Sequence, residues 1–191
     1  DAAARPNIEL MGVGCHIGSQ LVDPAPLADA ARRIVALAER LERSGITLGH
    51  IDLGGGIGIR YQDESPPAID CVVATLLEAL GSRRETLIVD PGRAIVGNAG
   101  VLLTRVEYVK QGEAKNFVVV DAAMNDLLRP ALYQAWHEVV AVRPLDGVKD
   151  LYDVVGPVCE SGDFLAKDRW LSVVSGGLLA IRSAGAYGMV M

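Results

Sequence analysis

Three consecutive glycines, Gly54-Gly55-Gly56, follow a short apolar run and form the stretch of the sequence best suited to hold an anion. Glycine lets backbone N–H groups approach a phosphate with no side chain in the way. A tight turn after a strand is the alternative interpretation, and the triplet alone leaves both open. Two nucleotide sites are disfavoured, because Ile59 stands where a Rossmann fingerprint has its last glycine and no G-K-[ST] sequence marks a P-loop.

Two further polar motifs end apolar runs on either side of the triplet. The sequence HIGSQ begins at His16, 39 residues before Gly55, and the sequence DPGR has its glycine 37 residues after Gly55. The aspartate of DPGR can hold a proton on a ring nitrogen, and its arginine can bind a carboxylate or a phosphate through a planar fork. A core histidine and a solvated acid–base pair in a turn are the alternatives that these residues, taken singly, leave open.

The second half of the chain carries two more candidate motifs. Arg129 and Tyr133 are four residues apart and share a face if the segment is helical, whereas an ordinary surface turn is the alternative. Cys159 stands beside Glu160 and close to Asp163. Acidic neighbours favour the protonated thiol, which suits a proton donor better than a nucleophile, although many lone cysteines are simply small core residues. The three histidines show no metal-ligand spacing, so no metal site is predicted.

The elements that would position the first three motifs alternate between strand and helix. Apolar runs at 8–15, 48–53 and 86–89 predict strands. One helix is expected from Asp23-Pro24 to near Gly45, and another from Pro66-Pro67 to Gly81. The near-equal spacing favours an α/β fold in which residues 1–100 are the C-terminal part of a (β/α)8 TIM-type barrel. Such barrels carry the active site at the carboxyl ends of their strands. Three units cannot close a barrel, so we expect the others upstream of Asp1.

The pattern changes near residue 100 to short strands separated by glycine, proline and charged residues. Strands are predicted at 101–109, 117–121, 139–142, 153–155 and 178–181. We therefore predict a second, mostly antiparallel β domain over residues 101–191, truncated at its end.

Composition limits the classes of partner. The formal charge is −6 and the pI is about 5.0, which disfavours nucleic acid and anionic membranes as partners. No apolar run has the length of a membrane span. Three cysteines without a C-x-x-C pair fit a reducing compartment. These properties predict a cytoplasmic protein that acts on a small molecule.

Six motifs in order together resemble one known family. They are HIGSQ at 16–20, GGG at 54–56, DPGR at 90–93, RPALY at 129–133, CESGD at 159–163 and GAYG at 185–188. In this combination the sequence is similar to the diaminopimelate decarboxylases. That family consists of pyridoxal-phosphate enzymes with an alanine-racemase-like barrel and a β domain. The resemblance spans essentially the whole chain.

The resemblance implies a cofactor site for pyridoxal 5'-phosphate, in which the serine, glycines and arginine of three motifs hold the phosphate. His16 would pack over the cofactor ring and Asp90 would face the pyridine nitrogen. Family members usually have glutamate at the latter position, so Asp90 is one methylene shorter. The residues that the resemblance assigns to the cofactor are His16, Ser19, Gly54, Gly55, Gly56, Asp90, Pro91, Gly92, Arg93 and Tyr187.

The resemblance also implies the substrate contacts and the proton donor. The reaction would convert meso-2,6-diaminopimelate into L-lysine and carbon dioxide, the last step of lysine biosynthesis. Cys159 would be the proton donor, reaching the active site of the partner subunit, so the implied active unit is a homodimer with shared sites. His16, Asp90 and Cys159 would be catalytic, and the residues implied for substrate binding are Arg93, Arg129, Tyr133, Glu160 and Tyr187.

The lysine that forms a Schiff base with the cofactor in this family has no counterpart in a matching motif. All four lysines, Lys110, Lys115, Lys149 and Lys167, lie in the predicted β domain. We therefore expect that lysine to lie outside these residues, and the 191 residues alone to be inactive. A decarboxylase of ornithine, arginine or carboxynorspermidine is the first alternative, and a non-catalytic regulatory homologue is the second.

Overall fold

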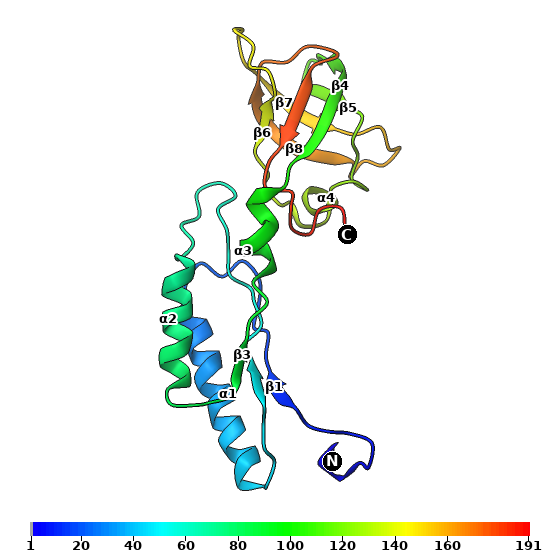
Figure 1. The fold of residues 1–191 in the computed structure, drawn as a ribbon. Helices are drawn as coiled ribbons and strands as arrows, with labels where there is room; N and C mark the ends of the chain where they lie inside the picture. Colours follow the sequence, from blue (N-terminus) through cyan, green and yellow to red (C-terminus); the bar gives the residue numbers. More distant parts are fainter. Residues whose placement is uncertain (1) are drawn as a thin grey trace. The chain divides into compact units, whose positions relative to one another are not determined.

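The computed structural model describes residues 2–191, which fold into two compact units (Figure 1). The first unit contains the residues up to Ile59 and Glu64–Ala94, and the second contains Arg60–Asp63 and Ile95–Met191. We predicted a domain boundary near residue 100, where helices give way to strands. The contacts divide the chain between Ala94 and Ile95 and place the short segment Arg60–Asp63 with the second unit.

The first unit is a three-stranded parallel sheet with two crossover helices. β1 (Gly12–Gly14), β2 (His50–Asp52) and β3 (Thr86–Ile88) lie in sequence order. α1 (Ala25–Arg43) connects the first pair of strands and α2 (Ile69–Leu80) the second. The two helices pack side by side (Figure 1). Because parallel strands need crossover connections, this arrangement confirms the predicted βαβ units.

α1 forms because apolar residues recur at helical spacing and face the sheet. Its buried residues are Leu27, Ala28, Ala31, Ile34 and Ala38. The Asp23 carboxylate accepts a hydrogen bond of 2.9 Å from the Ala25 N–H at the start, and Gly45 with φ of 80° follows the end. Both predicted ends are therefore close to the observed ones.

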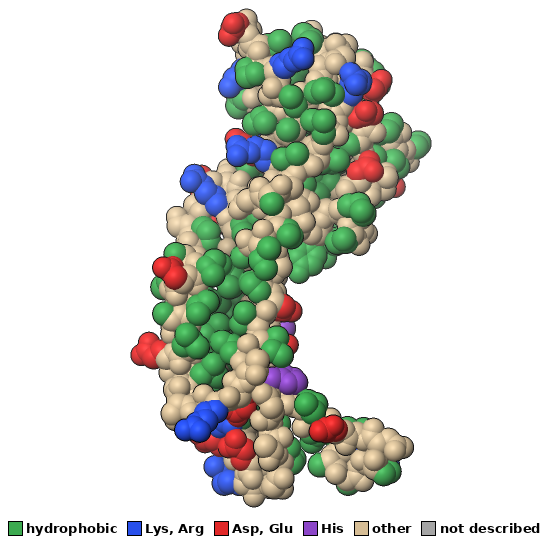
Figure 2. Space-filling model, viewed as in Figure 1, with side chains coloured by type: hydrophobic (Ala, Val, Ile, Leu, Met, Phe, Trp, Pro, Cys, Tyr) green, Lys and Arg blue, Asp and Glu red, His purple; other side chains and the backbone are tan. Residues whose placement is uncertain are grey.

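α2 begins later than predicted. The prolines at 66 and 67 stay outside the helix and Ala68 is extended, with φ −62° and ψ 144°, so the first helical residue is Ile69. A residue that precedes proline disfavours the helical region, which keeps Pro66 out of the helix. Gly81, with φ of 64°, ends the helix as predicted. Figure 2 shows apolar side chains gathered over these helices, and the exposed ones include Ile69, Val73 and Leu77.

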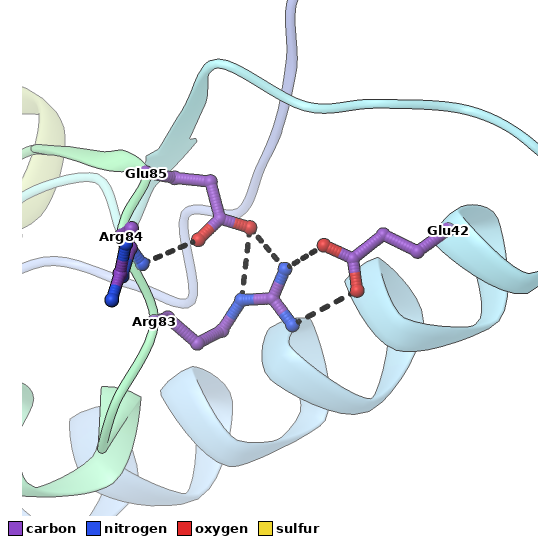
Figure 3. A network of polar contacts seen from close by, with 4 residues as sticks. All are labelled: Glu42, Arg83, Arg84 and Glu85. Atoms are coloured by element: carbon purple, nitrogen blue, oxygen red, sulfur yellow. Dashed lines mark hydrogen bonds and ion pairs between the residues drawn. The ribbon is translucent and has the colours of Figure 1, made fainter.

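An arginine clamp holds the end of α1 to the start of β3 (Figure 3). The Arg83 guanidinium lies between the Glu85 and Glu42 carboxylates and donates to both, with 2.5 Å between its Nη2 and Glu42 Oε1. The side chains of Arg83 and Glu85 are only 13% and 8% exposed, whereas Glu42 is 46% exposed. The clamp lies at the amino end of β3, so it is at the opposite end of the strand from Asp90.

The second unit is a six-stranded sheet in the order β6-β9-β4-β5-β7-β8. Only β5 and β7 pair in parallel, so the prediction of a mostly antiparallel sheet is confirmed. Its core includes Val118, Val120, Val154, Leu165 and Ile181. The strands are β4 (Leu102–Lys110), β5 (Asn116–Val120), β6 (Val139–Ala141), β7 (Asp150–Val155), β8 (Phe164–Leu171) and β9 (Leu178–Ile181).

β8 was not among the predicted strands. Three charged residues, Lys167-Asp168-Arg169, break its apolar alternation, and Asp168 has φ of 56° where the register with β7 shifts. The Asp168 N–H is held by a 2.8 Å hydrogen bond to Asp153 Oδ1. A bulge of this kind hides a strand from a period-two pattern.

Two short helices complete the described fold. α3 (Gly92–Val96) was not predicted. α4 (Arg129–Tyr133) shows that the segment of Arg129 and Tyr133 is helical, which was one of the two interpretations left open by the sequence. 3-10 turns occur at Ala2–Ala4 and Gly97–Ala99. Among the helices of residues 2–191, none combines the length and the apolarity that a membrane span requires.

Candidate functional site

The glycine triplet interlocks the three loops that follow β1, β2 and β3. A Cβ on Gly54 would lie 2.6 Å from the Cys15 carbonyl oxygen, and one on Gly55 would lie 2.2 Å from the Asp90 carbonyl oxygen. A Cβ on Gly56 would lie 2.1 Å from the Gly18 carbonyl oxygen. No side chain fits at these distances. The triplet is therefore required by backbone packing between loops, in addition to any role in binding an anion.

The same triplet offers backbone donors that could bind an anion. The Gly54 N–H donates to Asp52 Oδ1 at 2.7 Å. Within residues 2–191, the N–H groups of Gly55 and Gly56 make no hydrogen bond to protein, although Gly55 is buried. A buried N–H without a protein partner indicates a ligand or a water at that position. The donor set fits the phosphate of pyridoxal phosphate.

The first and third motifs also meet within the first unit. Arg93, which is 9% exposed, donates from Nη2 to Ser19 Oγ at 2.9 Å. The Asp90 N–H donates to the Gly54 carbonyl oxygen at 2.9 Å, and Asp90 is exposed. His16 Nδ1 lies 3.1 Å from where a Gly54 Cβ would be. The structure thus brings His16, Ser19, the triplet and the DPGR turn together.

Gln20 links the loop after β1 to the loop after β2, and it was not among the candidate residues predicted from the sequence. Its Nε2 donates to the Ile59 carbonyl oxygen at 2.6 Å, and its Oε1 accepts from the Ile59 N–H at 3.1 Å. The side chain therefore extends the backbone bridge between Leu21 and Ile57, which joins the same two loops. In the sequence, only its place inside HIGSQ marks Gln20, and that place does not identify a partner 39 residues away. In the structure its backbone is left-handed, with φ of 61°.

In the second unit Arg129 is held by a buried histidine. Arg129 Nη1 lies 3.0 Å from His137 Nε2, and the Arg129 Cζ lies 4.8 Å from the centroid of the Tyr61 ring. The Tyr61 and His137 rings meet edge to face, with centroids 5.4 Å apart. Tyr133 is on the same helix and is 63% exposed. Neither Tyr61 nor His137 was a candidate, because nothing in their spacing marks them.

The Cys159 segment is a tight loop fixed by Asp163. The buried Asp163 carboxylate accepts from the Val158 N–H and the Met124 N–H, each at 2.7 Å. Glu160 points its carboxylate toward its own loop, accepting from the Gly162 N–H at 3.2 Å, and both Cys159 and Glu160 are exposed. The alternative of a small core residue is therefore wrong for Cys159.

Tyr187 lies in a turn with left-handed backbone, at φ of 54°. Gly185 precedes it and packs so closely that a Cβ there would lie 1.8 Å from the Val96 carbonyl oxygen. The Gly185 N–H donates to the Gly97 carbonyl oxygen at 3.1 Å. The GAYG motif therefore joins the end of the chain to the segment around α3 within the second unit.

The comparison with family models decides the family. Residues 15–185 match the model described as the pyridoxal-dependent decarboxylase, C-terminal sheet domain. This chain belongs to the pyridoxal-dependent decarboxylases. The matched range begins just after β1 and contains the whole HIGSQ motif. It ends at Gly185, the first glycine of GAYG.

Individual members of the decarboxylase family are similar over the whole chain. The diaminopimelate decarboxylase of Pseudomonas aeruginosa is 58% identical over 190 residues, which is 100% of this chain and 46% of that protein. The corresponding protein of Aquifex aeolicus is 43% identical over 192 residues. The chain thus spans about half the length of the curated relatives it matches.

Solved structures of decarboxylases are similar in fold over nearly the whole of this chain. A diaminopimelate decarboxylase from Helicobacter pylori complexed with L-lysine has a TM-score of 0.92 and 41% identity, over 100% of this chain and 48% of that one. A lysine/ornithine decarboxylase from Vibrio vulnificus complexed with putrescine has a TM-score of 0.84 and 26% identity, over 96% and 51%. These matches confirm the α/β fold class with its sheet domain.

Proposed function

We propose that the full-length protein to which this chain belongs decarboxylates meso-2,6-diaminopimelate to L-lysine and carbon dioxide. One contrast carries the proposal. The chain is 58% identical to a diaminopimelate decarboxylase over its whole length, but only 26% identical to a lysine/ornithine decarboxylase of similar fold. The reaction would be the last step of lysine biosynthesis, in the cytoplasm.

The first unit would hold the cofactor. When bound, pyridoxal phosphate supplies an electron sink for the carbanion that remains after carbon dioxide leaves. The Gly55 and Gly56 N–H groups, Ser19 and the Arg93 guanidinium would bind its phosphate. Asp90 would keep the pyridine nitrogen protonated, and His16 would lie against the ring. The covalent lysine would come from outside residues 1–191, as expected from the positions of the four lysines.

The second unit would recognise the part of the substrate that does not react. Diaminopimelate carries a second carboxylate and a second ammonium at its distal centre. The Arg129 guanidinium and Tyr133 would bind that carboxylate, and Glu160 would bind the ammonium. Tyr187 would lie near cofactor and substrate. This pair of opposite charges suits diaminopimelate better than ornithine, which lacks the distal carboxylate.

Cys159 would return a proton to the carbon that lost carbon dioxide. Its exposure on a rigid loop supports a role at an interface, where the thiol of one subunit completes the site of the other. The active form would then be a homodimer with shared sites. No nucleic acid or membrane is proposed as a partner.

The test is to express the complete protein with pyridoxal phosphate and to measure carbon dioxide release from diaminopimelate, ornithine and arginine. Turnover of diaminopimelate is expected to exceed that of the other two, and Arg129→Ala is expected to abolish it. Faster turnover of ornithine or arginine would favour the related decarboxylases. No turnover of any of them by a protein that binds the cofactor would favour a non-catalytic homologue.

A further inference from the structure

We propose that His137 is a positioning residue, which holds the Arg129 guanidinium through a neutral imidazole in the orientation that binds the distal carboxylate of the substrate. The inference rests on the proposed function, because it deepens the role given there to Arg129. It adds a residue that acts through Arg129, with the Tyr61 ring as a second support.

The two hydrogen bonds of the imidazole determine its protonation. His137 Nε2 lies 3.0 Å from Arg129 Nη1, and guanidinium nitrogens only donate, so Nε2 accepts and carries no proton. His137 Nδ1 lies 2.9 Å from the Arg182 carbonyl oxygen, which only accepts, so Nδ1 carries the proton. The contacts are satisfied together by one species, the neutral Nδ1-protonated tautomer.

Burial and further contacts hold the imidazole in place. His137 has no exposed surface, its ring meets Tyr61 edge to face, and its carbonyl oxygen accepts from Arg169 Nη2 at 3.3 Å. Tyr61 also lies beneath the Arg129 guanidinium. A buried ring with its backbone and both nitrogens engaged has little freedom to turn, so it can orient a long, otherwise mobile arginine side chain.

The choice of a neutral partner has a chemical consequence. A carboxylate in place of His137 would form an ion pair with Arg129 and compete with the substrate carboxylate for the guanidinium charge. A neutral acceptor uses one N–H of the guanidinium and places no competing negative charge beside it. Arg129 is thereby prepared to bind an incoming carboxylate in a fixed geometry.

Two substitutions separate the two hydrogen bonds of His137 in the full-length, cofactor-loaded protein. His137→Asn keeps a donor near the Nδ1 position, facing the Arg182 carbonyl, but is too short to reach Arg129. His137→Gln reaches the Nε2 position with its amide oxygen. Because a hydrogen bond to a charged group is involved, we expect His137→Asn to raise KM for diaminopimelate roughly 5- to 30-fold with kcat within about 3-fold. His137→Gln should restore KM to within about 3-fold of the wild-type value.

A double-mutant cycle distinguishes positioning from a general structural effect. If His137 acts through Arg129, adding His137→Asn to Arg129→Ala should change L-lysine affinity less than about 2-fold, although it weakens lysine binding in the wild-type background. Cadaverine, which lacks the carboxylate, should bind equally well to the wild type and to His137→Asn. Calorimetric titration of both ligands measures these affinities without turnover.

The outcomes separate this inference from the proposed function. An unchanged KM and lysine affinity in His137→Asn, or equal losses in both Arg129 backgrounds, would overturn the positioning role while diaminopimelate turnover stands. Wild-type protein that binds L-lysine but does not turn over diaminopimelate would overturn only the proposed function. If His137→Asn does not fold, 15N NMR of the histidines, assigned with His137→Gln, decides instead: an Nε2-protonated or cationic His137 near neutral pH would refute the inference.

Discussion

Asp163 acts on the backbone of the Cys159 loop, whereas its neighbour Glu160 stays exposed. The sequence presents the two acids as equivalent neighbours of the thiol. In the fold, Asp163 is 4% exposed and accepts two backbone hydrogen bonds of 2.7 Å, from Val158 and Met124. Burial and backbone partners thus give Asp163 a structural task, whereas Glu160 remains exposed while it accepts from its own loop.

The two acids are therefore expected to respond differently to loss of charge. Asp163→Asn should lower the free energy of unfolding by about 1–3 kcal/mol, because charge-assisted hydrogen bonds to buried amides are weakened. Urea denaturation measures this.

The matched control is Glu160→Gln, which should leave the unfolding midpoint nearly unchanged and raise KM for diaminopimelate. Equal destabilisation by the two substitutions would contradict the separate roles.

At the scale of elements, the loops after β1, β2 and β3 depend on one another. The carbonyl oxygens of residues 15, 18 and 90 occupy the space that side chains would need at Gly54, Gly56 and Gly55. Gly92, in the same motif as Asp90, has open space around it and no positive φ. The glycines of these motifs therefore differ in what they tolerate.

Gly55→Ala should destabilise the first unit by roughly 2–4 kcal/mol, since the Asp90 carbonyl would have to move. Gly92→Ala, whose Cβ would meet nothing within 4 Å beyond its chain neighbours and its own helix backbone, should change stability by less than about 1 kcal/mol. Chemical denaturation of the two variants in parallel checks this pair. Equal stability of the Gly55→Ala and Gly92→Ala proteins would contradict the prediction, because it would show that the loop of Asp90 moves at little cost in free energy.

The arginine clamp also connects two elements, and it makes the free energy of unfolding depend on pH. Hydrogen bonds from Arg83 hold the pKa of the Glu85 carboxyl below its ordinary value, although burial alone would raise it. A carboxyl whose pKa is lower in the folded state stabilises the fold above its unfolded pKa. That contribution is lost as the pH falls through the folded pKa.

Glu85→Gln should accordingly cost about 1–3 kcal/mol of unfolding free energy at neutral pH. The difference from the wild type should shrink toward zero as the pH falls through and below the lowered pKa of Glu85. The exposed partner provides a control, because Glu42→Gln should cost less than about 1 kcal/mol. Guanidinium chloride would screen the ion pairs, so urea titrations at several pH values are the suitable measurement. A difference that persists in acid would contradict the role of the ionised carboxyl.

Sequence patterns predicted the parallel strands, both crossover helices and five of the strands of the second unit. Periodicity failed at β8, where the positive φ of Asp168 interrupts the alternation. Local motifs identified the glycine triplet and Arg93, but Gln20, Tyr61 and His137 act through partners distant in sequence. Such partnerships depend on tertiary packing, which a single sequence does not display.

At the scale of the whole molecule, the proposed homodimer predicts complementation between two inactive subunits. If Cys159 serves the partner's site, subunits with Cys159→Ala and subunits with Arg93→Ala form heterodimers that contain one intact site. Random association of the two should then restore about a quarter of wild-type specific activity. Co-expression gives this mixture, and the heterodimer isolated through two affinity tags should have about half of the wild-type specific activity. Activity that stays at the level of the single variants would refute sharing of the site.

The interlocked glycine loops also bear on how such a protein can change over evolutionary time. Because three loops are in backbone contact through Gly54, Gly55 and Gly56, an insertion in any one of them would displace the other two. Change there requires simultaneous adjustment at several positions, which is rare. Arg129 and Glu160 lie on separate short segments of the second unit, so a change at one need not displace the other. New substrate preferences should therefore arise in the sheet unit, while the loops of the first unit continue to present the same donors.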